Sequence, residues 1–215
     1  SKLEKIAASL LELQNTDGTL DSGNLGSPPD TGFVLEPICA GVSVLKQNNW
    51  EALDKTKQDL KRFIVNAGEA LATGGIHTPN HRWVVCSALA GINSLYPDQK
   101  YVDRIDEWLA DGIFIDSDGH SPERSRNYSP VENNAFITVG RLLDRPELFE
   151  PVRKNLEMTW YYMEPNGDLA TNDSRRQDQY SSRHILSYYM FYRFMANYDN
   201  DANFAAIAKL IETFD

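Results

Sequence analysis

Residues 74–90, GGIHTPNHRWVVCSALA, pass from a polar connection into an apolar helix within a few positions. The first half holds glycines, histidines, a proline and an asparagine, whereas VVCSALA is almost wholly apolar. Proline marks a helix start, because its missing N–H would have no helical partner in the first turn. A polar loop that leads into a buried helix is therefore the unit from which we expect this fold to be built.

The same unit recurs along the chain. Apolar residues spaced by three and four predict helices over 2–14, 32–48, 50–72, 80–96, 99–110, 130–143, 146–163, 178–198 and 201–214. The polar connections contain Asp17-Gly18, Gly74-Gly75, Asp118-Gly119 and Asn166-Gly167, at separations of 57, 44 and 48 residues. These separations match one helical hairpin and its return. The sequence therefore predicts an all-α array of helical hairpins, as a single domain over 1–215.

Each of the four connections leads to a helix that begins near residue 32, 80, 130 or 178. Alternate connections of stacked hairpins fall at the same end, so we expect these helix starts to meet on one rim. A helix start offers free N–H donors and the positive end of the helix dipole. Such a rim is suited to anionic groups.

Composition limits the classes of function. The chain has 215 residues, of which 41% are apolar, enough for one substantial core. A formal charge of −10 argues against general affinity for nucleic acid or for an anionic membrane. The chain has no apolar run of about eighteen residues, and its start, SKLEKIAASLLELQ, has the pattern of an amphipathic helix instead of a signal peptide. Cys39 and Cys86 lie in apolar helical runs, which predicts buried free thiols.

Arginines gather in the connections, although the protein is acidic. Six of the twelve arginines lie there: Arg82, Arg124, Arg126, Arg175, Arg176 and Arg183. Guanidinium groups suit carboxylate and sulfate oxygens, so a basic cleft is one interpretation. The other is that these arginines pair with neighbouring acidic residues, namely Asp116, Asp118, Glu123, Asp173 and Asp178.

Two motifs resemble a known group of enzymes. Asn80-His81 stands at a helix entrance, and Tyr128, 47 residues after His81, ends a DG-x-x-x-E-x-S-x-x-Y segment that begins at Asp118. Together they resemble the heparinase II/III and alginate lyase group of polysaccharide lyases, best over 70–185. The resemblance implies an (α/α) toroid, here incomplete because the chain has too few helices for a closed ring. It also implies that asparagine, histidine and tyrosine, with an arginine, perform β-elimination on uronic acid sugars.

The chemistry of β-elimination asks for the same residue types. Removing the C5 proton of a uronate builds negative charge beside its carboxylate, which Asn80 with Arg124 or Arg126 would neutralise. His81, in positive surroundings that favour the neutral imidazole, is the expected base. Tyr128 is the expected proton donor to the leaving oxygen. No metal or cofactor is required.

The expected substrate-binding residues are His77, Arg82, His120, Arg126, Arg175, Arg176 and Trp160. Structural roles compete with these assignments: Asn80 as a helix cap, His81 and Tyr128 as packing residues, and Trp160 as a core aromatic. His77 and His120 compete as solvated loop residues. His184 is expected inside the helix 178–198, beside Tyr180.

The expected partner is an acidic polysaccharide or oligosaccharide, and the expected location is periplasmic or secreted. Neither nucleic acid nor membrane is expected as a partner, and the sequence leaves the oligomeric state open. A glycosidase on the same helical ring is the alternative, with carboxylates drawn from Asp118, Glu123, Glu132, Asp173 and Asp178. A noncatalytic glycan-binding α/α domain is a further alternative.

Overall fold

The computed structural model describes residues 1–23, 25–48 and 50–214. The described chain is mostly helical and forms two compact units, Ser1–Gly112 and Ile113–Asp215, and each is described by itself. The expected all-α class is therefore confirmed. The toroid stays a prediction.

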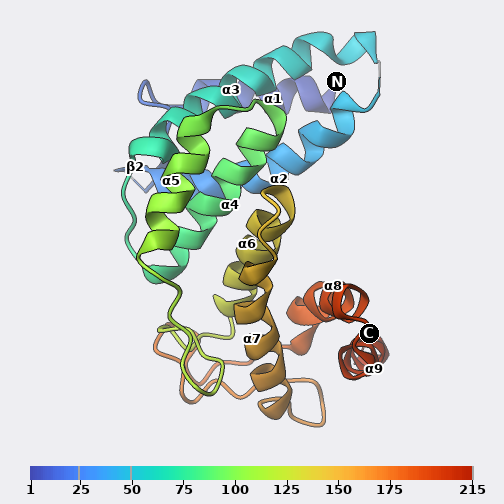
Figure 1. Ribbon diagram of the computed structural model, residues 1–215. Coiled ribbons are helices and arrows are strands. Elements are labelled where there is room, and N and C mark those ends of the chain that lie inside the picture. Colours follow the sequence, from blue (N-terminus) through green and yellow to red (C-terminus); the bar gives the residue numbers. More distant parts are fainter. Residues whose placement is uncertain (24, 49, 215) are drawn as a thin grey trace. The chain divides into compact units, whose positions relative to one another are not determined.

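The first unit begins with a helix and a short hairpin, followed by a layer of longer helices (Figure 1). Its elements are α1 (Lys2–Leu13), β1 (Leu20–Ser22), β2 (Leu25–Ser27), α2 (Pro28–Lys46), η1 (Glu51–Leu53), α3 (Asp54–Thr73), α4 (Pro79–Leu95) and α5 (Gln99–Ala110). The strands are antiparallel, with Leu20 opposite Ser27. The sequence analysis did not predict this hairpin.

Helices α2 and α4 pack side by side and begin at the same end of the unit. The ring of Phe33 in α2 lies edge-on to that of His81 in α4, with centroids 6.0 Å apart. Gly32 allows the close approach, since a Cβ there would lie 3.1 Å from a methyl group of Val84. Helix α4 is buried on nearly all sides. Two of the expected helix starts therefore do meet within this unit.

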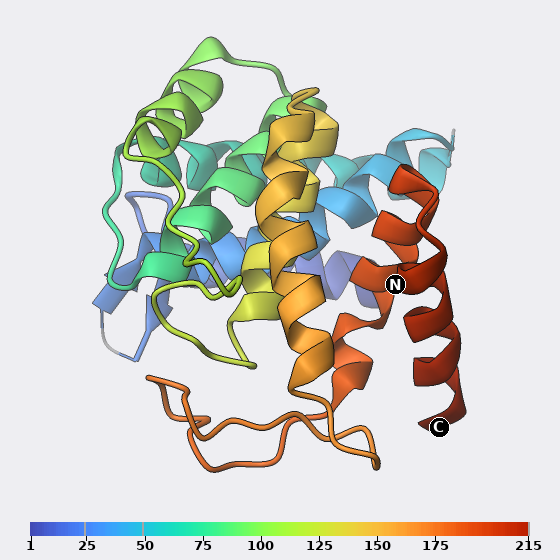
Figure 2. The same cartoon turned by 60° about the horizontal axis from the view of Figure 1, so that its bottom comes forward.

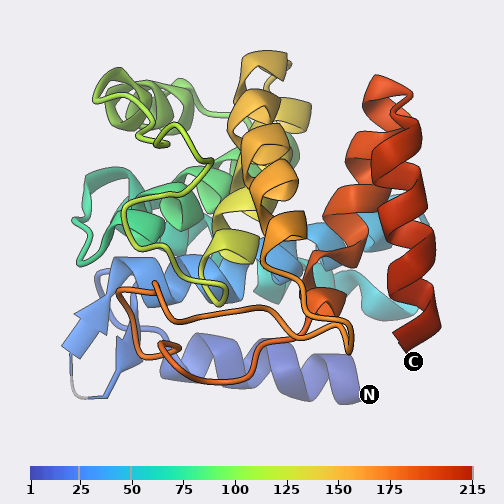
Figure 3. The same ribbon diagram turned by 90° about the horizontal axis from the view of Figure 1, so that it is seen from below.

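The second unit holds two helical pairs and two long loops. Its elements are α6 (Ser129–Leu142), η2 (Pro146–Leu148), α7 (Phe149–Tyr161), η3 (Ile185–Tyr188), α8 (Tyr189–Asp199), α9 (Ala202–Ile211) and η4 (Glu212–Phe214). Figure 2 shows α6 beside α7, and α8 beside α9. The loop from α7 to η3 is the long orange segment of Figure 3.

Three of the four predicted connections adopt one five-residue turn, in NTDGT (15–19), DSDGH (116–120) and EPNGD (164–168). In each, the first residue's N–H bonds the fifth carbonyl at 2.7–2.9 Å, and the glycine N–H bonds the first carbonyl at 2.9–3.1 Å. The glycines have φ of +92°, +94° and +84°, where glycine is favoured. The Gly74-Gly75 connection differs, because Gly74 ends α3 with φ −76°.

The helix expected over 178–198 is wrong in its first half. Residues 178–184 are not helical, and only Tyr189–Asp199 forms an α-helix. The amide N–H groups of Leu169 and Ile185 instead bond the carbonyls of Arg183 and Gly167, which ties this segment to the turn at 164–168. His184 therefore lies in an extended bridge with Asp168.

Other helix boundaries shift by a few residues. Helix α2 begins at Pro28 instead of residue 32, because Ser27 caps it and prolines fill its first two positions. The helix expected over 146–163 is a 3₁₀ turn followed by α7. Cys39 and Cys86 are free and buried, as expected. Within the described residues, no helix combines the length and apolar character that crossing a membrane requires.

Candidate functional site

The residues expected to act lie in two groups, one in each unit. Asn80 and His81 occupy the first turn of α4, which Pro79 opens after an extended Thr78. Asn80 is fully buried, and its Nδ2 donates to Thr78 Oγ1 at 3.0 Å. Thr78 holds the N-cap position, and no side chain makes a capping bond there. The alternative role of Asn80 as a helix cap is therefore wrong.

His81 is half-buried between aromatic neighbours. The exposed ring of His77 lies edge-on to it, with centroids 5.9 Å apart, and Phe33 lies on another side. This arrangement brings together the imidazoles expected to act as base and as substrate-binding group.

Arg82 contacts the carboxyl end of α5. Its guanidinium lies 3.5 Å from a carboxylate oxygen of Asp111 and 3.4 Å from the Gly112 carbonyl. It also lies over the ring of Trp108, 5.7 Å from the centroid. Asp111 already balances the positive charge of Arg82, which weakens the expected role of Arg82 in substrate binding.

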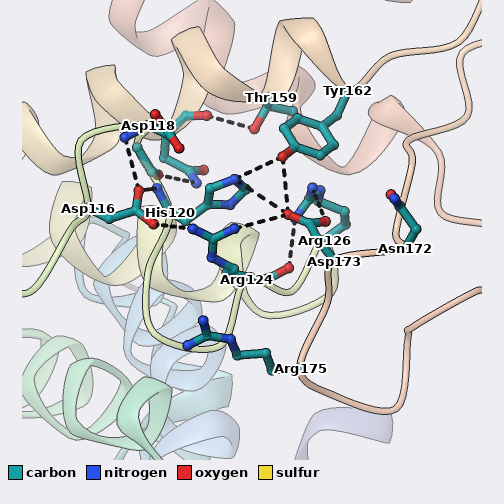
Figure 4. Close-up of polar contacts among 12 residues, drawn as sticks. Asp116, Asp118, His120, Arg124, Arg126, Thr159, Tyr162, Asn172, Asp173 and Arg175 are labelled. Carbon is teal, nitrogen blue, oxygen red and sulfur yellow. Dashed lines mark hydrogen bonds and ion pairs between the residues drawn. The ribbon is translucent and has the colours of Figure 1, made fainter.

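In the second unit, the turn at 116–120 leads into a buried polar network (Figure 4). Asp116 accepts hydrogen bonds from the N–H groups of Asp118 (3.0 Å) and His120 (2.9 Å). Its other oxygen pairs with Arg124 at 2.7 Å. Arg124 has a φ of +48°, so the turn and this ion pair hold it in an uncommon backbone conformation.

His120, Tyr162 and Asp173 form the centre of the network. His120 Nε2 lies 3.1 Å from the Tyr162 hydroxyl, which donates to Asp173 Oδ2 at 3.1 Å. This direction assigns the His120 proton to Nε2, because the tyrosine oxygen must accept from it. His120 is 1% exposed, so the alternative of a solvated loop histidine is wrong.

Arg126 is buried beneath this network. Its Nη2 pairs with Asp173 Oδ1 at 2.7 Å, and its Nη1 donates to the Arg124 carbonyl at 2.7 Å. Its guanidinium also lies 3.9 Å from the centroid of the Tyr162 ring. Arg126 therefore holds the loops together and does not meet solvent.

Burial and charge set the protonation of this network. Burial, and then the positive charge of Arg126, lower the pKa of His120, which favours the neutral imidazole. Burial, and then the Asp173 carboxylate, raise the pKa of Tyr162. Burial opposes ionisation of Asp116, but the N–H of His120 and the guanidinium of Arg124 outweigh it and lower the pKa.

Tyr128 lies at the N-cap position of α6 and is half-buried. Gln177 Nε2 donates to its hydroxyl at 2.5 Å, and the Arg176 guanidinium lies 4.8 Å from its ring centroid. Arg176 pairs in turn with the buried Glu123 at 2.9 Å. Tyr128 is therefore held on two sides by residues of the 162–184 loop.

The remaining expected substrate-binding residues lie apart from the network. Arg175 is exposed, and its Nη1 donates to the Pro122 carbonyl at 3.3 Å. Trp160, at the end of α7, lines a cavity of about 510 Å³ with Tyr161 and residues of α9. The alternative interpretation of the connection arginines, pairing with neighbouring acids, is confirmed for Arg124, Arg126 and Arg176.

Two buried carboxyl groups have pKa values that are shifted in opposite directions. Burial would raise the pKa of Asp178, but hydrogen bonds from Ser174 and Ser125 outweigh it and lower the pKa. Burial raises the pKa of Glu132 to about 8, with a smaller contribution from the charge of Glu123. Glu132 is therefore neutral in the folded chain at neutral pH.

Sequence reasoning missed part of this site. Neither Gln177 nor Tyr162 is among the site residues expected from the sequence. Asp173 and Asp178 were named as acids near arginines, but Arg126 lies 47 residues before its partner Asp173, and Ser125 lies 53 residues before its partner Asp178. Only the density of charged and polar residues in DSRRQDQYSSR pointed to this loop.

The chain was compared with protein-family models, curated proteins and solved structures, and it matches none of them. Across residues 1–23, 25–48 and 50–214, His, Cys, Asp and Glu side chains form no group of three able to hold a metal ion.

Proposed function

We propose that the chain carries the acting residues of a polysaccharide lyase, which cleaves a uronic-acid-containing polysaccharide by β-elimination. The setting of Tyr128 carries the proposal. This half-buried phenol has Gln177 bonded to its oxygen and the Arg176 cation over its ring. A phenol fixed in this way suits proton transfer to or from an anionic sugar.

In the proposed reaction, an exposed guanidinium pairs with the uronate carboxylate and so lowers the cost of charge that builds beside it. Asn80, the donor expected from the sequence, is fully buried and bonded to Thr78, so it is not given this role. A base must take the C5 proton, and His81 of the first unit is the residue that the sequence predicts for this role. The C4–O bond breaks as the C4–C5 double bond forms, and Tyr128 gives its proton to the leaving oxygen. The products are an unsaturated uronate and a new chain end.

The choice of arginine follows from the contacts in the site. Arg124 is paired with Asp116, and Arg126 is buried against Asp173. The exposed guanidinium of Arg175 is therefore better suited to meet the substrate carboxylate. We give Arg124 the secondary task of holding the loop that ends in Tyr128.

The same contacts disfavour the glycosidase alternative, which needs two carboxyl groups facing the scissile bond. Asp173 is engaged by Arg126, and Glu123 by Arg176. Asp178 is buried and accepts several hydrogen bonds. These carboxylates serve as partners inside the protein, which supports elimination over hydrolysis.

The test is a screen of alginate, pectate, heparan sulfate and chondroitin sulfate for products that absorb in the near ultraviolet. We expect absorbance to rise with one of them. Tyr128→Phe and His81→Ala should each reduce the rate by about 10²–10⁴-fold. Tyr198→Phe, which removes the hydroxyl of a tyrosine in α8 that is 51% exposed, is the matched control and should retain the rate.

The other outcomes separate the alternatives. Saturated reducing ends without near-ultraviolet absorbance would support a glycosidase. Binding of a polymer without either product would support a noncatalytic glycan-binding domain. Turnover that survives both Tyr128→Phe and His81→Ala would refute the residue assignments.

A further inference from the structure

A single buried carboxylate holds the turn that leads into Tyr128. Asp178 Oδ1 accepts from the hydroxyls of Ser125 (2.8 Å) and Ser174 (2.7 Å). Its Oδ2 accepts from the backbone N–H groups of Arg126 (2.9 Å) and Asn127 (3.3 Å). Asp178 therefore joins the loop 162–184 to residues 125–127, which lie just before α6.

The contact requires an acceptor at position 178. Ser125 Oγ already accepts from the N–H groups of Asn127 and Tyr128, both at 3.1 Å. A hydroxyl has two lone pairs and one proton, so Ser125 has only its proton left to offer. An ionised carboxylate meets this need and also accepts the backbone N–H groups on its other oxygen.

The same segment holds the phenol itself. Gln177 Nε2 donates to the Tyr128 hydroxyl at 2.5 Å. Arg176 lies over the ring and is fixed by the buried carboxylate of Glu123 at 2.9 Å. Gln177 is exposed, and its flexible side chain loses conformational entropy when it is held in one position. The hydrogen bond to Tyr128 must offset this loss.

We infer that residues 173–178 are the positioning element for Tyr128: Asp178 fixes its backbone, Gln177 fixes its hydroxyl, and neither residue contacts the substrate. The inference deepens the proposed function and rests on it for the effect on catalysis. The contacts themselves are testable without a substrate. Gln177 and Asp178 are thus positioning residues.

The kinetic test compares Gln177→Leu with Gln47→Leu, which replaces an exposed glutamine of the first unit. Loss of one hydrogen bond to Tyr128 should lower kcat about tenfold and leave KM within about twofold. Gln47→Leu should change neither. A Gln177→Leu variant with unchanged kcat, or with a raised KM alone, would overturn the positioning role.

The structural test uses amide hydrogen exchange and NMR of the whole chain. In Asp178→Asn, exchange at the Arg126 and Asn127 amides should accelerate at least about tenfold, with α9 unchanged. In Tyr128→Phe, the side-chain amide signals of Gln177 should move, whereas Tyr198→Phe should leave them in place. Unchanged exchange in Asp178→Asn, or unmoved Gln177 signals in Tyr128→Phe, would overturn the inference.

These readouts separate the two proposals. If no uronate polymer is cleaved, the proposed function fails, while exchange and NMR still decide the positioning element. If Asp178→Asn does not fold, the Gln177 signals in Tyr128→Phe decide it.

Discussion

The guanidinium of Arg126 forms an ion pair with the carboxylate of Asp173, with Nη2 2.7 Å from Oδ1, although the arginine side chain has 0% exposure. The pair joins the loop 116–128 to the loop 162–184. A buried cation is costly without its partner, so the two loops depend on each other. This buried charge pair is therefore one of the contacts that hold the candidate site of this unit together.

Asp173→Asn removes the charge and keeps the shape of the side chain. We expect a loss of about 3–5 kcal/mol in the free energy of unfolding, because Arg126 stays buried without a carboxylate. Urea denaturation measures the loss. Asp59→Asn is the control, since its partner Lys55 is 82% exposed, and it should cost about 1 kcal/mol or less. Equal losses in both variants would contradict this account.

Glu132→Gln should change how stability depends on pH. The folded chain keeps a proton on Glu132 up to about pH 8, whereas the unfolded chain releases it near the ordinary value of 4.5. The folded state binds more protons in this interval, so ionisation of Glu132 lowers stability as pH rises from 4.5 to 8. Glutamine does not titrate and removes this contribution.

The variant should therefore match the wild-type chain near pH 4.5 and exceed its free energy of unfolding by on the order of 4 kcal/mol at pH 8. Denaturant titrations at several pH values measure the difference. Glu12→Gln, at an exposed position of α1, controls for the loss of one carboxylate. A Glu132→Gln difference that is constant with pH would show that Glu132 is not buried as a neutral acid.

Local patterns predicted most of the helices, because apolar residues recur in them at spacings of three and four. The D-G and N-G pairs also predicted the turns at Gly18, Gly119 and Gly167. Each of these glycines has a positive φ, which glycine adopts without the steric cost of a Cβ. These features depend on residues close together in the chain, so one sequence suffices to find them.

Features that depend on distant residues were missed. The spacing of Tyr180, His184 and Tyr188 favoured a helix, but bonds to the turn at 164–168 draw residues 183–185 into an extended path. His120 was expected to meet substrate or solvent, yet Tyr162 and Asp173, which lie 42 and 53 positions further on, enclose it. Neither partner could be identified from local spacing.

The cysteines give a prediction about the first unit. Burial raises the pKa of the Cys39 thiol to about 12, and Cys86 is equally enclosed. The reactive form is the thiolate, so a thiol reagent such as dithionitrobenzoate should label neither in the native chain. Both should react at once in denaturant. Rapid labelling of the native chain at neutral pH would show that α2 and α4 open readily around Cys39.

Alanine substitutions at Gly119 and Gly112 allow the cost of backbone strain to be measured apart from the cost of a steric clash of the added Cβ. Both have positive φ, +94° and +81°, so alanine at either should cost about 1–2 kcal/mol in backbone strain. A Cβ at Gly119 would lie 2.3 Å from the Lys154 carbonyl oxygen, whereas a Cβ at Gly112 meets no atom within 4 Å. The turn at 116–120 therefore packs directly on the backbone of α7.

We expect Gly119→Ala to lower the free energy of unfolding by at least about 2 kcal/mol more than Gly112→Ala, since the turn must move away from α7. Movement of this turn would also displace Asp116 and His120, so the amides at 118 and 120 should lose protection from hydrogen exchange in Gly119→Ala alone. Equal destabilisation by the two variants would mean that strain accounts for the whole cost and that contact with α7 does not fix the turn.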